Sequence, residues 1–348
     1  MATLDYSEVE LIRLITHKVG NKFNDEGFNL SNETSSYSED TLEYLVKYFF
    51  NSFKSEEFFQ FDHSVGLEMN EVYSLAKGIF SDRNNFIPNS QSISKLLYDT
   101  STLPNIKTGE CNIAYFSQLA LEGSRVDAIG IFKSESDAPF IKMTQAEQKF
   151  FIQHDFGFEI KGIDKGCLIF NTDEASGFRL IVVDNTNKSV DAQYWSRDFL
   201  QVKPCSDDYH HTKQFMNITK SFLTEKLSEE FDVSKTDKID FMNRSVDYFK
   251  SNDSFDKGDF EESVFQDEQL IDSFRKYDQD FRQINNLDVA DSFDISSQAV
   301  KRQARVFKSV LKLDKNFHVY IHGDKSLIQR GKESDGRKFY KIYYDQEQ

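Results

Sequence analysis

Apolar residues recur along this chain with two different periods. Between about residues 38 and 99 they are three to four positions apart, which is the spacing of amphipathic helices. Ser38 followed by acidic residues is typical of a helix start, and the apolar stripe after it runs to Phe53. The spacing predicts helices over about residues 38–53, 70–80 and 90–99. Residues 11–19 have mixed spacing and fit either a strand or a short helix.

After the third helix the pattern changes to short β-rich runs separated by Gly, Asp, Asn or Ser. These runs predict an antiparallel sheet and start at Cys111, Arg125, Phe156, Gly166 and Phe178. Helical spacing returns over residues 213–227, 238–252 and 263–281. Because the chain has only 4 Pro, long uninterrupted helices are expected there.

The end of the chain combines both periods. Residues 294–297 form a helix start, and helical spacing follows at Ala299, Val300, Ala304, Phe307 and Val310. Strand-like runs come next, over residues 316–323, 326–331 and 338–345, and Asp335-Gly336 is typical of a tight hairpin turn. The predicted fold class is α+β, with helices and an antiparallel sheet in an N-terminal domain. Its predicted parts are that domain (1–200), an acidic helical section (201–295) and a basic C-terminal helix plus β-hairpin segment (296–348).

Charge sharpens this division. The 348 residues carry a formal net charge of −16, yet residues 296–348 contain twelve Lys and Arg against six Asp and Glu, a net charge of +6. The remainder carries −22, and residues 253–294 alone carry −9, from thirteen acids and four bases. An acidic protein repels nucleic acid and anionic membranes at long range, so net charge alone disfavours both partners. The basic end is the exception.

Two groups of cations at this end are candidate DNA contacts. The first would lie along one face of a helix, with Arg302 beside it, and consists of Lys301, Arg305, Lys308 and Lys312. The second comes from the predicted hairpin and consists of Arg330, Lys332, Arg337, Lys338 and Lys341. Among them stand Phe339, Tyr340, Tyr343 and Tyr344, and cations with aromatics suit phosphate contact and base stacking. Two alternatives stay open: the helix pairs with the acidic helices before it, and the aromatics face a core.

Other chemistry is weaker in this sequence. His318 and His322 would share one face of a strand, but only Asp324 offers a further ligand and metal sites usually take at least three, so no metal site is predicted. His210-His211 and His154 are interpreted as surface residues. The chain has no GxxxxGK[ST], GxGxxG, GxSxG or HExxH motif, so no cofactor is predicted and an enzyme is disfavoured.

Cysteine usage and hydropathy predict the compartment. Cys111, Cys167 and Cys205 are widely spaced, which suits neither a disulfide framework nor a metal site, and we expect reduced, buried thiols. No run approaches the roughly 20 apolar residues that a membrane span needs. The N-terminal MATLDYSEVE has no basic flank and no apolar region, so no signal peptide is expected. A cytoplasmic location without membrane contact is the prediction.

Several stretches resemble bacterial nucleoid-associated proteins of the NdpA or YejK type. They are residues 119–135, 164–171, 194–200 and 307–323, and the similarity extends in the expected order from Val19 to the end of the chain. The resemblance implies a cytoplasmic protein that is associated with the nucleoid by binding DNA. It supplies no catalytic or base-reading residues.

We therefore expect a non-enzymatic protein that binds double-stranded DNA with little sequence specificity, because phosphate contacts position a protein without reading bases. Other nucleoid proteins and a second copy of the chain are further candidate partners. Two other functions stay open: a protein-interaction module whose acidic section recruits a basic partner, and a metal-dependent nuclease. A basic and aromatic surface suits duplex DNA, single strands and RNA alike, so the sequence does not choose among them.

Overall fold

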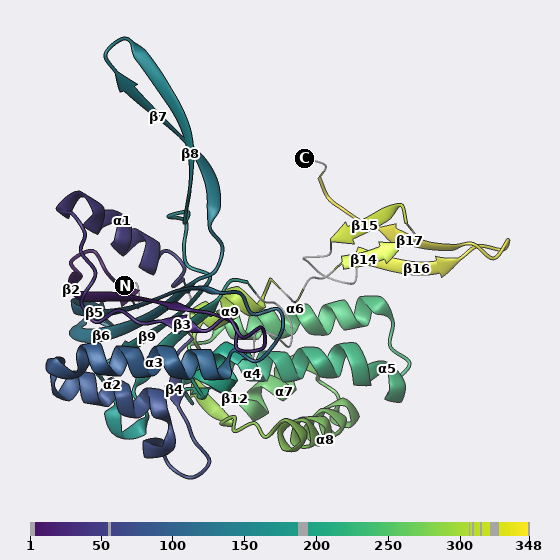
Figure 1. The fold of residues 1–348 in the computed structure, drawn as a ribbon. Helices are drawn as coiled ribbons and strands as arrows, with labels where there is room; N and C mark the ends of the chain where they lie inside the picture. The colour runs from purple at the N-terminus through teal and green to yellow at the C-terminus, as the bar shows by residue number, and fades with distance from the viewer. Residues whose placement is uncertain are drawn as a thin grey trace. The chain divides into compact units, whose positions relative to one another are not determined.

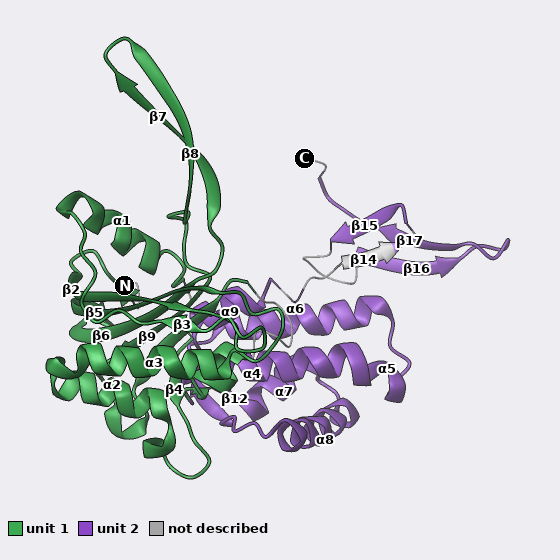
Figure 2. Ribbon diagram, viewed as in Figure 1, with its two compact units in different colours: residues 1–205 green, residues 206–348 purple. Residues whose placement is uncertain are grey.

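The chain forms two compact units, residues 1–205 and 206–348 (Figures 1 and 2). The computed structural model describes residues 4–54, 57–186, 194–305, 307, 310–313, 315–320 and 327–346, without the side chains of residues 310–312. Helices and antiparallel strands confirm the predicted α+β class. The three-part division at residues 200 and 295 stays a prediction.

Unit 1 is built on one antiparallel sheet. Nine strands within its described residues form this sheet in the order β11-β4-β10-β9-β6-β5-β2-β3, with β1 beside β5. The strands are β1 (Leu4–Asp5), β2 (Glu10–Val19), β3 (Phe28–Asn29), β4 (Phe59–Phe61), β5 (Gly109–Leu121), β6 (Ser124–Ser134), β9 (Lys165–Phe170), β10 (Arg179–Asp184) and β11 (Val202–Pro204). The helices are α1 (Glu39–Phe50), α2 (Glu71–Ser81) and α3 (Phe86–Thr100). The three predicted helices are confirmed, and the open segment at residues 11–19 is a strand.

Helices cover both faces of this sheet. In β5, Ile113 belongs to the core cluster that includes α2 and α3, whereas Phe116 belongs to the cluster that includes α1. Phe49 of α1 stacks on Phe132 of β6, with ring centroids 4.4 Å apart. Because the central strands are buried on both faces, they appear in the sequence as continuous apolar runs without alternation.

Residues 138–157 form a separate hairpin that projects from the sheet of unit 1 (Figure 1). Its strands are β7 (Ala138–Ala146) and β8 (Lys149–Gly157), and no other described strand pairs with them. The strand predicted from Phe156 to Gly162 is therefore largely wrong. β8 ends at Gly157, which pairs with Ala138, the first residue of β7. The loop that follows leads into β9.

Unit 2 is a helical core with small two-stranded sheets. Its helices are α4 (Asp208–Ser221), α5 (Leu227–Glu230), α6 (Lys235–Ser251), α7 (Lys257–Val264), α8 (Glu268–Asn285) and α9 (Ser297–Gln303), with a π-helical turn at Phe222–Lys226. Three antiparallel pairs lie in its described residues: β12 (Ser254–Asp256) with β13 (Ser292–Asp294), β14 (Val310–Leu313) with β15 (Phe317–Tyr320), and β16 (Ile328–Lys332) with β17 (Lys338–Ile342). Phenylalanine rings fill the core, where the Phe215 centroid lies 4.3 Å from that of Phe255.

The single helix predicted over residues 263–281 is wrong, because α7 and α8 divide it. Gln266 has a φ of 61°, a left-handed conformation that cannot continue a helix. Asp267 then starts α8, since its side chain accepts hydrogen bonds from the backbone N–H groups of Gln269 and Leu270. Local capping therefore outweighs the continuous apolar spacing.

The cysteines lie largely as predicted. Cys111 and Cys167 are buried in the sheet of unit 1, and burial raises the pKa of the Cys111 thiol to about 11. Cys205 is only half-buried, so the prediction of a buried thiol is wrong for that residue. In the part of the chain that the structure describes, no helix has the length and apolar character to cross a bilayer.

Candidate nucleic-acid interface

The basic end of the chain contains two β-hairpins, β14–β15 and β16–β17, attached to α6 by a small apolar cluster. Ile239 of α6 is buried, and the strand residues that pack against it are Leu313, Val319, Ile328 and Tyr340. Both hairpins contribute to this cluster, so their strands have a defined place beside α6. Most other side chains of the two hairpins are exposed.

The register of β16 and β17 decides which cations share a face. Arg330 lies opposite Tyr340, and Lys332 lies opposite Lys338. Residues directly opposite each other point to the same side of a ladder, so the three cations form one basic face next to the anchoring Tyr340. All three side chains are exposed. Lys341 lies opposite Gln329 on the other face and is also exposed.

The Lys332–Lys338 pair is unfavourable by itself, because like charges opposite each other destabilise a sheet. Residues 328–342 contain five bases and two acids. One of these acids, Asp335, forms an ion pair with Arg337 across 2.6 Å between Oδ2 and Nε. The basic face thus keeps positive charge that its own hairpin does not neutralise.

The predicted basic helix is wrong beyond Gln303, where α9 ends. Residues 310–313 instead form β14, in which Lys312 is paired with His318 of β15. Lys308 lies outside the described residues. The sequence VLKL at residues 310–313 fits both helical and strand spacing, and pairing with β15 makes it a strand. The four cations predicted on one helical face therefore do not share one.

The remaining predicted cations near α9 differ in role. Lys301 lies on the helix and Arg305 in the turn after it, and both side chains are exposed. Arg302 donates from Nη1 to the Tyr209 hydroxyl at 3.2 Å, which connects α9 to α4. Arg302 therefore has a structural contact as well as a charge.

The aromatic residues of the terminal hairpin divide between the two interpretations. Tyr340 is half-buried against Ile239, as the core interpretation predicts. Phe339, Tyr343 and Tyr344 are 39%, 40% and 69% exposed. Three accessible rings therefore lie among the cations.

The acidic helices form ion pairs within their own section. Asp278 is almost fully buried and accepts from Lys257 at 2.5 Å and from Arg282 at 2.6 Å. Glu261 is equally buried and accepts from Arg275 at 2.7 Å. In the described structure, every ion pair of an acid between residues 253 and 294 is with one of these three bases. We call residues 253–294 the acidic block. These contacts give no support to the alternative in which the acidic block neutralises the basic end.

The histidines do not gather into a site within the described residues. His318 is exposed on β15, and its predicted partner His322 lies outside the described residues. His154 is exposed as predicted, whereas His210 is buried, so its interpretation as a surface residue is wrong. Among the described residues, no group of three or more His, Cys, Asp or Glu side chains is placed to hold a metal ion.

Sequence reasoning missed a buried charge network in unit 1. The ammonium groups of Lys133 and Lys165 lie 3.0 and 2.8 Å from the two oxygens of Glu135, and all three side chains are at most 4% exposed. Burial by itself would raise the pKa of Glu135, but the two ammonium groups together outweigh it and lower that pKa. Burial lowers the pKa of Lys133, and Glu135 opposes this only in part.

This network lies at the root of the β7–β8 hairpin. Glu135 directly follows β6, and Lys165 begins β9. The backbone N–H groups of Glu135 and Ser136 donate to one carboxylate oxygen of Asp164, at 2.6 and 3.1 Å. One signal was available in the sequence: Lys133 stands inside an apolar strand run, where a lysine is rarely found unless it is paired.

A second buried polar group of unit 1 is His17 of β2. Its Nδ1 accepts from the backbone N–H of Ser31 at 3.1 Å, and its Nε2 lies 3.0 Å from the Ser90 hydroxyl. The Ser90 hydroxyl donates to the carbonyl of Ile87, so Nε2 is the donor toward Ser90. Burial lowers the pKa of His17 to about 4. Protonation of His17 would place a second ring proton on Nδ1, against the Ser31 N–H that donates to this nitrogen.

Comparison with known protein families gives a match over most of the chain. Residues 15–348 match the family model described as nucleoid-associated protein YejK. The matched range includes almost all of unit 1 and the whole of unit 2. A search of curated proteins found no match.

Proposed function

Because the chain belongs to the YejK family of nucleoid-associated proteins, we propose that it binds double-stranded DNA directly through its basic C-terminal end. The binding is non-enzymatic and has little sequence preference, since exposed cations contact phosphates and leave bases unread. The protein acts in the cytoplasm, where the nucleoid lies.

The Lys332–Lys338 pair is the observation that carries this proposal. Two ammonium groups opposite each other on an exposed ladder repel, and Arg330 adds a third charge to the same face. A phosphate backbone relieves this repulsion when it binds. Each phosphate that is neutralised also releases condensed counterions into solution.

The other predicted contacts have different weights. Lys301, Arg305 and Lys341 are exposed, and they extend the contact beyond the basic face. Arg337 contributes less because Asp335 already pairs with it. Arg302, Lys308 and Lys312 stay predicted contacts.

Overall acidity does not prevent this binding. At about 0.15 M salt the screening length is about 8 Å, so a phosphate at the basic face responds mainly to nearby charges. The buried acids of the acidic block also have partners of their own, as the Asp278 and Glu261 pairs show. Steep salt dependence is therefore expected.

The test is DNA binding by the double variant Lys332→Gln with Lys338→Gln. Removing the repulsion leaves the hairpin at least as stable, so lost binding cannot be assigned to unfolding. In mobility-shift titrations of duplex DNA at several salt concentrations, the slope of log K against log salt should fall by about 2, because each phosphate contact contributes about 0.9.

The matched control is Lys95→Gln with Lys142→Gln, which changes net charge equally at two exposed positions of unit 1. This control should keep the slope of the unmodified protein. Equal slopes for all three proteins, or no binding at low salt by the unmodified chain, would overturn the proposal.

The same preparation tests the absence of catalysis. Supercoiled plasmid incubated with the protein and Mg²⁺ or Mn²⁺ should stay supercoiled. Cleavage that stops on adding a chelator would replace the binding proposal with a metal-dependent nuclease.

A further inference from the structure

The β7–β8 hairpin carries an apolar face that nothing in the described structure covers. Its register pairs Ile141 with His154 and Met143 with Ile152. Because residues opposite each other share a face, this side of the ribbon consists of Pro139, Ile141, Met143, Gln145, Phe150, Ile152, His154 and Phe156. We call it the apolar strip. The opposite side carries the charged residues of both strands, Lys142, Lys149 and Asp155, together with Phe140 and Phe151.

The strip is exposed to an extent that is unusual for large apolar side chains. Its exposed fractions are 58% for Phe156, 62% for Phe150, 66% for Met143, 67% for Ile141 and 68% for Ile152. A two-stranded ribbon gains little stability in water by itself, and exposed contiguous apolar patches of this kind mark interaction sites.

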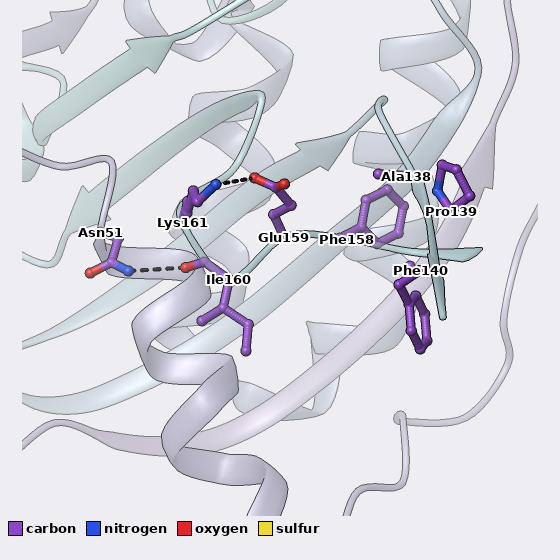
Figure 3. Close-up of a pocket in the computed structure, with 9 residues that line it drawn as sticks. Asn51, Ala138, Pro139, Phe140, Phe158, Glu159, Ile160 and Lys161 are labelled. Carbon is purple, nitrogen blue, oxygen red and sulfur yellow. Dashed lines mark hydrogen bonds and ion pairs between the residues drawn. The ribbon is translucent and has the colours of Figure 1, made fainter. Parts of the chain in front are cut away.

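Two further exposed apolar side chains follow the end of β8. Phe158 and Ile160 follow at the same two-residue spacing and are 36% and 44% exposed. With Pro139 and Phe140 they line a pocket of about 590 Å³ at the root of the hairpin (Figure 3). Asn51 fixes one wall by donating from Nδ2 to the Ile160 carbonyl at 3.0 Å. The hairpin thus offers a protruding apolar strip and, at its root, a concave surface whose lining is mainly apolar.

We propose that the apolar strip is a self-association surface, on which a second copy of this chain docks through the same strip. This interface is separate from the basic end and requires no DNA.

Charge favours a second copy over other partners. The strip contains no Asp, Glu, Lys or Arg, so it offers neither cations for a nucleic acid nor a charged group for a basic or acidic protein. Most of this chain is acidic, so two copies repel where acidic surfaces meet. The uncharged strip, on a hairpin that projects from unit 1, is a place where they approach without that penalty.

The area of the strip is also sufficient. With about 120 Å² exposed by each of its five large side chains, one copy contributes roughly 600 Å². Phe158 and Ile160 bring this area toward the roughly 800 Å² that each partner contributes to a standard interface. In a two-fold contact both copies contribute the same patch, so the strip need only complement itself.

The test compares two double variants on the same ribbon. Met143→Asp with Ile152→Asp places two carboxylates at the centre of the strip. Thr144→Asp with Gln153→Asp places two on the opposite face, one position along each strand. Sedimentation velocity across the micromolar range should give a dimer, twice 40.5 kDa, for the unmodified chain and for the second variant. The first variant should associate roughly a hundredfold more weakly, because apolar contact would bury unpaired charge.

Circular dichroism checks that both variants are folded. A milder variant, Ile141→Gln with Ile152→Gln, should weaken association less than the two carboxylates do. A monomeric unmodified chain would overturn the proposal, as would equal association of the Met143→Asp/Ile152→Asp variant and the unmodified chain. Equal loss in both Asp variants would overturn it too, because the effect would then not belong to the strip.

Discussion

Two hairpins of this protein have the same backbone architecture and opposite chemistry. In β7–β8 the register gathers apolar side chains on one face, whereas in β16–β17 it gathers Arg330, Lys332 and Lys338. Both faces are exposed. Successive side chains of a β-strand point to opposite faces of the hairpin. A hairpin therefore presents an apolar or a cationic face depending on which residues occupy alternate positions.

The hairpins also differ in how they are attached. The root of β7–β8 lies beside the buried Lys133–Glu135–Lys165 network of unit 1, whereas β16–β17 is attached to α6 through Ile239. A buried ion network is costly to break, and a small apolar cluster is less so. Removing one attachment at a time therefore tests whether the two hairpins are independent.

The largest effect is expected from Glu135→Gln. This change removes the carboxylate that Lys133 and Lys165 share and leaves Lys165 only Asp184, 3.8 Å away, so the free energy of unfolding of unit 1 should fall by about 3–5 kcal/mol. Trp195 is the only tryptophan of the chain and is buried in unit 1, so its fluorescence during urea unfolding reports that unit.

The matched control for that change is Glu110→Gln. Glu110 lies in the same sheet and pairs with Lys18 across 3.9 Å, with the Lys18 and Glu110 side chains 60% and 34% exposed. Its loss should cost less than about 1 kcal/mol. A similar small cost for Glu135→Gln would show that the network does not stabilise the root of the hairpin.

A change of pH should lower the stability of unit 1 without a mutation at either hairpin. Above pH 6.5 His17 is neutral in both states; as pH falls toward 4, only the unfolded chain binds the proton. Stability of unit 1 should therefore fall over this window, by about 3 kcal/mol in total. Urea midpoints from Trp195 fluorescence at successive pH values measure it.

The decisive variant for this pH effect is His17→Gln, which should flatten that part of the pH dependence. His154→Gln changes an exposed histidine of β8 and should leave the dependence as it is. If His17→Gln keeps the full slope between pH 6.5 and 4, the buried imidazole is not its source.

The smallest effect is expected from Ile239→Ala. It removes the centre of the cluster that holds the basic hairpins, at a cost of about 2 kcal/mol. Hydrogen exchange of β14–β17 should become faster, DNA binding should weaken, and the Trp195 transition should stay in place. Ile284→Ala on α8, where the side chain is 81% exposed, is the control and should change none of these. Unchanged exchange in Ile239→Ala would argue against this attachment.

Sequence reasoning succeeded where local spacing and burial agree. The helices at residues 39–50, 71–81 and 86–100 each place one apolar stripe in a core, so three-to-four spacing identified them. It failed for residues 138–157, because a ribbon exposed on both sides lacks the burial that makes an alternation easy to recognise. It failed again at residues 310–313, where pairing with β15 made a strand of a sequence that fits both periods.

The candidate interface, too, could be predicted from the sequence only in part. The cations of the basic end could be identified by counting charge, yet which of them share a face depends on register, and Arg302 has a contact with Tyr209 that no count reveals. The Lys133 network was missed because its charges come together from β6 and β9, which are separated in sequence by the apolar hairpin.

The sequence by itself determined the α+β class, the acidic body with a basic end, and the likeness to nucleoid-associated proteins, because composition and short-range periodicity are properties of neighbouring residues. Only the tertiary structure decided that the basic helix is short, that Lys332 faces Lys338, and that the apolar strip of β7–β8 stays uncovered within the described residues. The physical reason is that register and burial are set by partners distant in the chain, whose identity local patterns do not encode.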